Sequence, residues 1–200
     1  MLVVESQYFP PLEYFSLLKD RAELVIDGHE HFVKQTYRNR CHILTSNKIL
    51  PLSVPLSGAN KKIRTKNIQI NYQENWQKDH WRGILSTYNK SPFFEYYEGH
   101  IRAIIHGNHK FLIDLNQEIL SFCLKVLQLN VNITYSEEYI ESSIEELEDY
   151  RSVIHPKISH IGRKIYRPVA YTQVFGNNFV ENLSILDLIF CCGPDSKTYI

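Results

Sequence analysis

The start of the chain alternates short apolar runs with an amphipathic stretch. Leu2-Val3-Val4 and Leu24-Val25-Ile26 are apolar throughout, which is typical of short buried strands. Between them, Pro10-Pro11 precedes apolar residues at helical spacing, which predicts a helix that ends near Lys19. A strand, a helix and a strand in this order predict a βαβ unit with parallel strands.

The middle of the chain changes from strand-like to helical patterns. Apolar residues at 32–33, 49–54 and 63–70 predict the strands of a β-rich insert at about 30–70, with polar turns such as Ser57–Asn60 between them. Apolar stripes then predict a helical region at about 75–130. One stripe consists of Trp76, His80, Ile84 and Tyr88, and the other of Leu112, Leu115, Ile119, Phe122 and Val126.

The last third is less regular until its final element. Val131–Tyr135 is predicted to return to the sheet, Glu137–Glu148 to form a solvated acidic face, and Arg151–Arg167 to form loops. Ser184-x-x-Asp187 has the spacing of a capping box, and the apolar run 185–192 predicts a buried helix that Gly193-Pro194 ends. Because a capping box accounts for Ser184, we do not assign it as a nucleophile.

These elements predict an α/β fold. We expect a mostly parallel sheet flanked by helices, with a Rossmann-like βαβ start and a β-rich hairpin insert. A length of 200 residues predicts a single domain.

Composition limits the functional classes. The chain has 22 basic and 22 acidic residues, and this balance argues against general nucleic-acid binding. Leu2–Val4 is too short for the apolar part of a signal peptide, and no run of about 18 apolar residues is present. The four cysteines lack metal-binding or disulfide spacing, so we expect reduced thiols in a cytoplasmic protein.

The polar run from Lys34 to Ile43 suggests a ligand site. It contains Arg38 and Arg40, which in an extended chain would share one face and could bind an anion as a fork. Ligands of parallel sheets bind beyond the carboxyl ends of the strands. We therefore expect residues 5–10, Asp27 and residues 34–40 to line the main pocket.

Other candidate residues have a structural alternative. Asp27, His29 and His31 alternate and could hold a metal ion if they lay on a strand, but a polar surface turn is the favoured interpretation, and we assign no metal site. His80 is either a general base or a satisfied core histidine. Asn116, on the inward face of its helix, either braces a loop or contacts a ligand.

Several motifs occur together in a characteristic order. They are Gln7-Tyr8-Phe9-Pro10, Tyr14-Phe15, Lys34 through Arg38-Asn39-Arg40, Trp76 with His80, Tyr88-x-x-x-Pro92-Phe93-Phe94, Asp114-Leu115-Asn116, Tyr171-x-Gln173 and Leu183–Asp187 followed by Gly193-Pro194. In this order they resemble the WbqC-like family, whose members are bacterial proteins often encoded among genes for surface polysaccharide synthesis. The chain departs from the family pattern at Glu5-Ser6, in a shortened segment 141–167, and at Cys191 or Cys192.

The resemblance implies a cytoplasmic transferase that acts on an activated, anionic glycan precursor such as a nucleotide sugar. We assign His80 and Asp27 as catalytic, with substrate binding by Tyr8, Lys34, Arg38, Asn39, Arg40, Tyr88 and Asn116. A nucleotidyltransferase-like enzyme and a non-catalytic module that binds sugar phosphates or nucleotide sugars are the alternatives. The sequence identifies no cofactor and no oligomeric state.

Overall fold

A four-stranded parallel sheet forms the centre of the computed structural model, which describes residues 1–59, 62–143, 146–176 and 178–200. Its strands follow the order β7-β2-β1-β8. They are β1 (Leu2–Val4), β2 (Glu23–Ile26), β7 (Asn132–Tyr135) and β8 (Glu148–Asp149). Val3 pairs with Val25, and Leu24 pairs with Ile133, so apolar residues meet across the central strands.

The predicted βαβ unit is confirmed. Helix α1 (Leu12–Leu18) begins directly after Pro11, and all but one of its residues are buried. Every residue of β1 is buried as well, which explains why the run of three apolar residues lacks alternation. The predicted return of residues 131–135 to the sheet is also confirmed, because β7 pairs in parallel with β2.

Strand β8 was not predicted. Glu148 and Asp149 pair with Leu2 and Val3 through backbone hydrogen bonds at the edge of the sheet. Residues 137–143, which begin the acidic stretch, are exposed or half-exposed as expected. Residues 144 and 145 of that stretch, and Asn60 of the predicted turn 57–60, lie outside the described residues.

The insert contains two antiparallel pairs, whose bounds differ from those predicted. In the hairpin of β3 (Arg40–Leu44) and β4 (Ile49–Ser53), Arg40 pairs with Ser53. In the second pair, β5 (Leu56–Ser57) joins β6 (Gln69–Ile70). The predicted strand at 32–33 is wrong, since these residues have no regular structure. Within the predicted strand at 63–70, residues 69–70 form β6, whereas residues 64–67 form a bridge and a short 3-10 helix (Thr65–Asn67).

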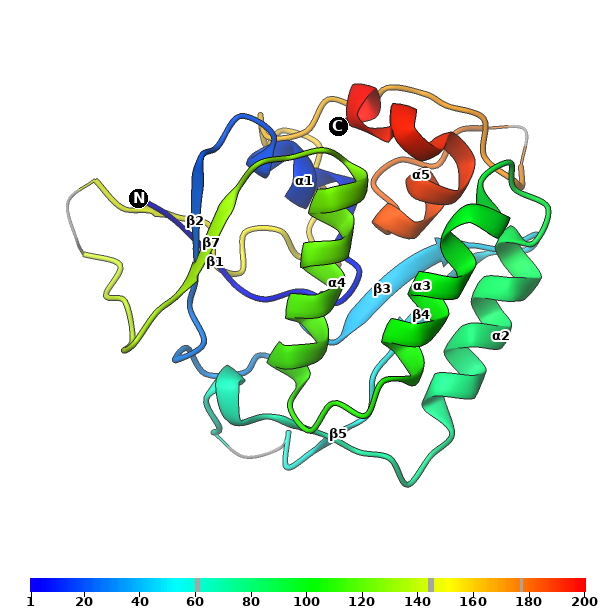
Figure 1. Cartoon of the computed structure of the whole chain (residues 1–200). Helices are drawn as coiled ribbons and strands as arrows, with labels where there is room; N and C mark the ends of the chain where they lie inside the picture. Colours follow the sequence, from blue (N-terminus) through cyan, green and yellow to red (C-terminus); the bar gives the residue numbers. More distant parts are fainter. Residues whose placement is uncertain (60–61, 144–145, 177) are drawn as a thin grey trace.

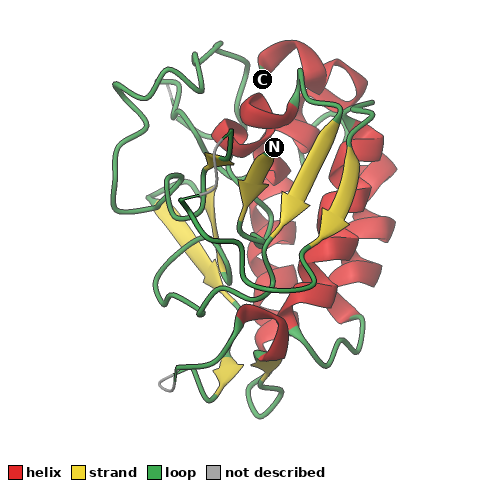
Figure 2. Cartoon of the chain, turned by 90° about the vertical axis from the view of Figure 1, so that its left-hand side faces the viewer, coloured by secondary structure: helices red, strands yellow, loops and turns green. Residues whose placement is uncertain are grey.

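Three long helices stand beside one another to the right of the sheet (Figure 1). They are α2 (Trp76–Tyr88), α3 (Phe94–His106) and α4 (Leu112–Val126). All four residues of the first predicted stripe are buried, but the sequence interpretation did not separate α3 from its neighbours. In the view turned by 90°, the helices gather on one side of the strands and loops cover the other (Figure 2). The described ranges contain no helix that is both long and apolar enough to cross a membrane.

Helix α5 (Ile185–Cys192) is buried as predicted, and it ends at Gly193. Gly193 has a φ of 54°, and a Cβ atom there would overlap the ring of Phe93. Only glycine meets both requirements, which explains the sharp end of the helix. A 3-10 helix (Gly193–Tyr199) follows α5, and all four cysteines of the chain are free.

Candidate functional site

Charged residues collect where the four parallel strands end. Glu5 follows β1, Asp27 follows β2, Ser136 follows β7, and residues 150–152 follow β8. Because the strands are parallel, their carboxyl ends lie at one edge of the sheet. We call these residues, together with the side chains that they contact, the carboxyl-edge cluster.

The carboxylate of Asp27 is fully buried and has three donors. Its Oδ1 accepts hydrogen bonds from the backbone N–H of His29 at 2.8 Å and from the hydroxyl of Ser136 at 2.9 Å. Its Oδ2 forms an ion pair with Arg151. Arg151 also binds Asp149 at 2.6 Å and holds the pKa of that carboxyl at about 2 through its hydrogen bonds. Asp27 and Asp149 are therefore both paired with Arg151, which follows β8.

Arg38 is the second cation of the cluster, and its side chain is completely buried. Its Nε and Nη2 each donate to Glu30 at 2.7 Å, and Nη2 also reaches the Ser152 hydroxyl at 3.0 Å. Its Nη1 lies 3.9 Å from Glu5 and, within the described part of the chain, has no hydrogen-bond partner. Burial lowers the pKa of Arg38, but the neighbouring Glu5 and Glu30 outweigh it and leave that pKa raised.

Glu5 connects the two halves of the cluster. It accepts hydrogen bonds from the Gln7 amide at 2.9 Å and from the backbone N–H of Ser152 at 2.8 Å. Ser152 has a φ of 61°, which is unusual for a residue with a side chain and is typical of a backbone held in place by its contacts. Arg38 and Arg151 also influence each other, since the charge of Arg151 opposes protonation of Arg38.

Residues 150–163 form a covering segment over this edge. Arg151 and Ser152 hold its start, while Arg163 binds the buried carboxylate of Glu13 at 2.7 Å and 2.8 Å. Lys157 contacts Gln35, which belongs to the polar run of residues 34–43. The segment thus closes the strand ends with charged contacts to three separate parts of the chain.

The structure contradicts the geometry expected for the arginine fork. Arg38 lies in a turn, and only Arg40 lies on a strand, so the two residues do not share one face of an extended chain. Arg40 is half-buried and donates to the Ser53 hydroxyl at 2.9 Å. Lys34 is exposed in a turn. The three cations therefore have different environments instead of one common face.

The alternation of Asp27, His29 and His31 does not occur on a strand either. β2 ends at Ile26, and the following residues form a bend. His29 is buried with its Nε2 accepting from Lys66 at 2.6 Å, whereas His31 is exposed. No group of three or more histidine, cysteine or acidic side chains in the described ranges is arranged to hold a metal ion.

Tyr8 and His80 meet in the core, on the side of α2 that faces the hairpin. The Tyr8 hydroxyl lies 2.8 Å from Nδ1 of His80, and Trp76 packs edge-on against the imidazole. Burial lowers the pKa of His80 to about 4 and raises that of Tyr8 well above its ordinary value. At neutral pH the tyrosine is therefore protonated and the imidazole uncharged, so the Tyr8 hydroxyl can donate a hydrogen bond to Nδ1 of His80.

Two asparagines brace the turn that carries Arg38. The Asn116 amide donates to the carbonyl of Arg38 at 2.8 Å, and the Asn39 amide donates to the carbonyl of Val54 at the same distance. Oδ1 of Asn116 is buried and has no partner among the described residues. The contact observed for Asn116 is thus with the protein backbone, one of its two predicted roles.

Asp187 was missed as a functional candidate because its spacing from Ser184 resembled a capping box. The hydroxyl of Ser184 does cap α5, since it accepts from the Leu186 amide at 3.3 Å. Asp187, however, accepts from Tyr88 at 3.1 Å, Tyr171 at 2.7 Å and Gln173 at 2.9 Å. Burial raises its pKa. An acidic residue on a helix that is otherwise apolar on every side was the signal in the sequence.

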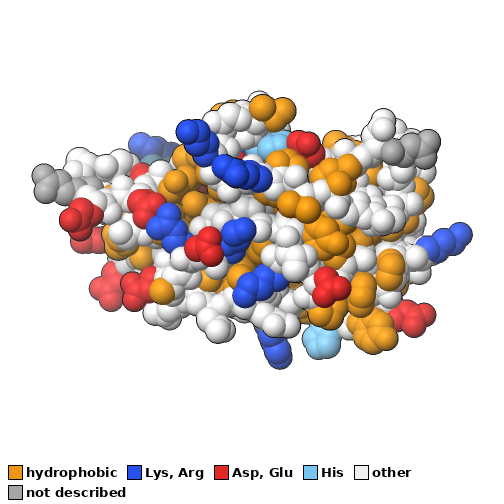
Figure 3. All heavy atoms as spheres, turned by 90° about the horizontal axis from the view of Figure 1, so that it is seen from above, with side chains coloured by type: hydrophobic (Ala, Val, Ile, Leu, Met, Phe, Trp, Pro, Cys, Tyr) orange, Lys and Arg blue, Asp and Glu red, His pale blue; other side chains and the backbone are white. Residues whose placement is uncertain are grey.

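The expected rim does not line the pockets found in the described structure. One of these pockets lies between the end of α2 and residues 172–175, and another lies between α4 and β7. Residues 5–10, Asp27 and residues 34–40 line neither, because the covering segment and the ion pairs fill their edge. Seen from above, on the side away from the carboxyl ends of β2 and β7, the surface mixes basic, acidic and hydrophobic side chains and has no uniform charge (Figure 3).

Comparisons with known proteins extend over nearly the whole chain. The model of the WbqC-like protein family matches residues 5–157 and 162–199. The chain is 24% identical over 225 residues to "Uncharacterized protein Rv1507c" of Mycobacterium tuberculosis (strain ATCC 25618 / H37Rv), with 99% of this chain and 96% of that protein covered. No solved structure matches. The family match includes the strand ends, the polar run and helix α5, and the chain belongs to the WbqC-like protein family.

Proposed function

We propose that this protein is a cytoplasmic transferase that acts on an activated, anionic glycan precursor, such as a nucleotide sugar, in surface polysaccharide synthesis. The observation that carries the proposal is the convergence of Glu5, Asp27 and Arg151 at the carboxyl edge of a parallel sheet. Ligands of such sheets bind at this edge. Membership of the WbqC-like family supports the glycan context.

The proposed anionic ligand would bind to the guanidinium groups of the cluster. Carboxylates surround these groups in the structure, Glu5 and Glu30 at Arg38, and Asp27 and Asp149 at Arg151. A phosphate would therefore displace one of the carboxylates and accept hydrogen bonds from the guanidinium group in its place. It would compete with Glu5 for the Nη1 atom of Arg38, which has no hydrogen-bond partner among the described residues.

The remaining predicted residues have distinct proposed roles. Asp27 would orient or deprotonate an acceptor hydroxyl, and Tyr8 and Asn39 would orient polar groups of the substrate. His80, held neutral by burial, would carry the proton. Lys34, Arg40, Tyr88 and Asn116 complete the proposed set. Substrate entry requires the covering segment to move, because Asp27 and Arg38 are fully buried.

A non-catalytic binding module is the second candidate, and one observation favours it. Asp27, Arg38 and His80 each have protein partners that a catalytic cycle would have to displace. A module that binds a nucleotide sugar needs only the covering segment to open and close. This candidate shares the ligand class with the transferase and differs in turnover.

Binding and turnover can be separated in one series of measurements. Thermal-shift and calorimetric titrations with nucleotide sugars, with and without Mg²⁺, should give a specific ligand for the wild-type protein. Arg151→Gln should weaken the binding of this ligand by about 1.5–3 kcal/mol, the scale of a charge-assisted hydrogen bond. Arg82→Gln, which changes an exposed arginine of α2, is the matched control.

Arg40 provides a separate test of the residue selected from the sequence. Arg40→Lys should weaken binding nearly as much as Arg40→Ala if the planar guanidinium is required. Release of the sugar or the nucleotide over time would identify a transferase, whereas binding without release would identify the module. Absence of binding by every nucleotide sugar would refute both.

A further inference from the structure

A pocket at the other side of the molecule has its own set of unused polar groups. It lies between the C-terminal end of α2 and the loop of residues 172–175, with a volume of about 490 Å³. This volume is within the range of pockets for small molecules. In Figure 1, α2 lies on the right, whereas β1 and β2 lie on the left, so the pocket is separate from the carboxyl-edge cluster.

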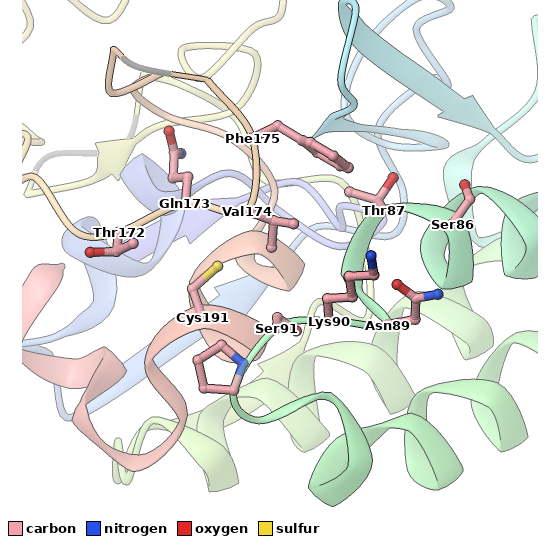
Figure 4. Close-up of a pocket in the computed structure, with 11 residues that line it drawn as sticks. Ser86, Thr87, Asn89, Lys90, Ser91, Thr172, Gln173, Val174, Phe175 and Cys191 are labelled. Carbon is pink, nitrogen blue, oxygen red and sulfur yellow. The ribbon is translucent and has the colours of Figure 1, made fainter.

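A lysine supplies the charge of this pocket. The Lys90 ammonium points into the space that Thr87, Val174 and Phe175 enclose (Figure 4). The side chains of Lys90, Asn89 and Thr172 line the pocket and make no hydrogen bond or ion pair within the described ranges. The hydroxyl of Thr87 is buried and also lacks a partner there. The pocket therefore offers the cation of Lys90, the amide of Asn89 and the hydroxyl of Thr172 to a ligand, while the buried hydroxyl of Thr87 lies behind them.

The opposite wall is fixed before any ligand arrives. Gln173 donates to Asp187 and to the carbonyl of Val180, both at 2.9 Å, and accepts from the amide of Val180 at 2.8 Å. Asp187 is itself buried and bound by Tyr88 and Tyr171. A wall held by this many hydrogen bonds can orient a ligand with little loss of conformational entropy.

We propose that this pocket binds a small polyhydroxylated molecule with one anionic group, such as a sugar phosphate or a sugar acid. Lys90 would pair with the anion, Asn89 and Thr172 would hydrogen-bond the hydroxyls, and the half-buried ring of Phe175 would pack against the sugar ring. One lysine suits one anionic group, while the hydroxyl of Thr172 and the amide of Asn89 suit a neutral polar body. This site is additional to the one in the proposed function and does not depend on it.

Calorimetric titration tests the site with four probes: glucose 6-phosphate, glucuronate, glucose and inorganic phosphate. A charged sugar should bind at least tenfold more tightly than either glucose or inorganic phosphate. The two charged sugars distinguish a phosphate-binding from a carboxylate-binding pocket. Equal binding of inorganic phosphate and glucose 6-phosphate would refute recognition of the sugar, and no binding of either charged sugar at about 10 mM would refute the site.

Variants assign the binding to this pocket. Lys90→Gln should lower the affinity for the charged sugar about tenfold, to the affinity for glucose. Phe175→Leu should weaken the binding of both the charged sugar and glucose severalfold. Lys78→Gln changes an exposed lysine of α2, outside the pocket, and should have no effect. Unchanged affinity in Lys90→Gln would overturn the assignment. Arg151→Gln should leave this binding intact while it weakens nucleotide sugars, so failure of one proposal remains distinguishable from failure of the other.

Discussion

His80 should make the stability of the protein depend on pH between about 4 and 6.5. Burial lowers its pKa from 6.5 to about 4 in the folded protein, whereas in the unfolded chain the imidazole regains its ordinary pKa. Below pH 6.5 the unfolded state therefore binds a proton that the folded state does not bind. The free energy of unfolding should rise with pH across this interval and fall as the solution is acidified.

The size of the effect follows from the difference in pKa. A difference of about 2.5 units corresponds to about 3 kcal/mol, because each unit is worth about 1.4 kcal/mol. The full amount is lost once the pH falls below about 4, when the folded state is protonated as well. This is a large share of the stability of a typical domain, which is about 5–15 kcal/mol.

Urea unfolding at a series of pH values measures this contribution. His42 and His155 also have lowered pKa values, so the comparison must be made between variants. His80→Gln keeps a polar side chain near Tyr8 but removes the titrating imidazole. Between pH 7 and pH 4, the free energy of unfolding should therefore fall by about 3 kcal/mol less in this variant than in the wild type. His31→Gln, at an exposed position, is the control.

Two results would show that His80 does not have this role. If His80→Gln retains the full pH dependence of the wild type, His80 does not titrate with a lowered pKa. An NMR titration of the imidazole of His80 gives the same answer directly. A pKa near 6.5 in the folded protein would mean that the contact with Tyr8 leaves the imidazole accessible to water.

Three further changes test other parts of the structure. Asp187→Ala should lower stability by about 3–5 kcal/mol in urea unfolding, because the buried hydroxyls of Tyr88 and Tyr171 and the half-buried amide of Gln173 lose their acceptor; a loss below about 1 kcal/mol would contradict this. Ser184→Ala removes a helix cap and should lower stability by about 1–2 kcal/mol without changing ligand affinity in calorimetry. Acidification from pH 4 to pH 2 should lower the free energy of unfolding by about 1–2 kcal/mol, because Asp149 has a lowered pKa in the folded protein and becomes protonated. Acid titrations of Arg151→Gln should not show this loss.

The regular elements could be predicted because burial leaves a periodic pattern. The buried stripe Trp76, His80, Ile84 and Tyr88 repeats every four residues, so α2 was visible in the sequence. Strand β3 has a similar signal, since Cys41 and Ile43 are buried while Arg40 and His42 are half-exposed. This strand was not predicted, because its cationic residues were interpreted as ligand contacts and the alternation of buried and half-exposed positions was not considered. Strand β8 has no such pattern, because a two-residue edge strand pairs through its backbone.

The candidate site was only partly visible. The strand-end rule identified Glu5 and Asp27, and the structure does place both at the carboxyl edge of the sheet. It could not identify Arg151 as the partner of Asp27, because the two residues are more than one hundred positions apart and the segment around Arg151 has no periodicity. Nor could it show that Arg38 would be buried against Glu30, since arginines in polar runs are usually exposed.

The buried charges at the carboxyl edge are themselves an argument for a function. Removing Asp27, Arg38 and Glu30 from water is costly, and apolar residues of similar volume often stabilise a fold as well or better. A core built for stability alone would not need two guanidinium groups and the buried carboxylates that surround them. Such an arrangement suits a site that exchanges partners: Glu30 holds Arg38 and Asp27 and Asp149 hold Arg151, and the proposed anionic ligand would replace one of these carboxylates at its guanidinium group.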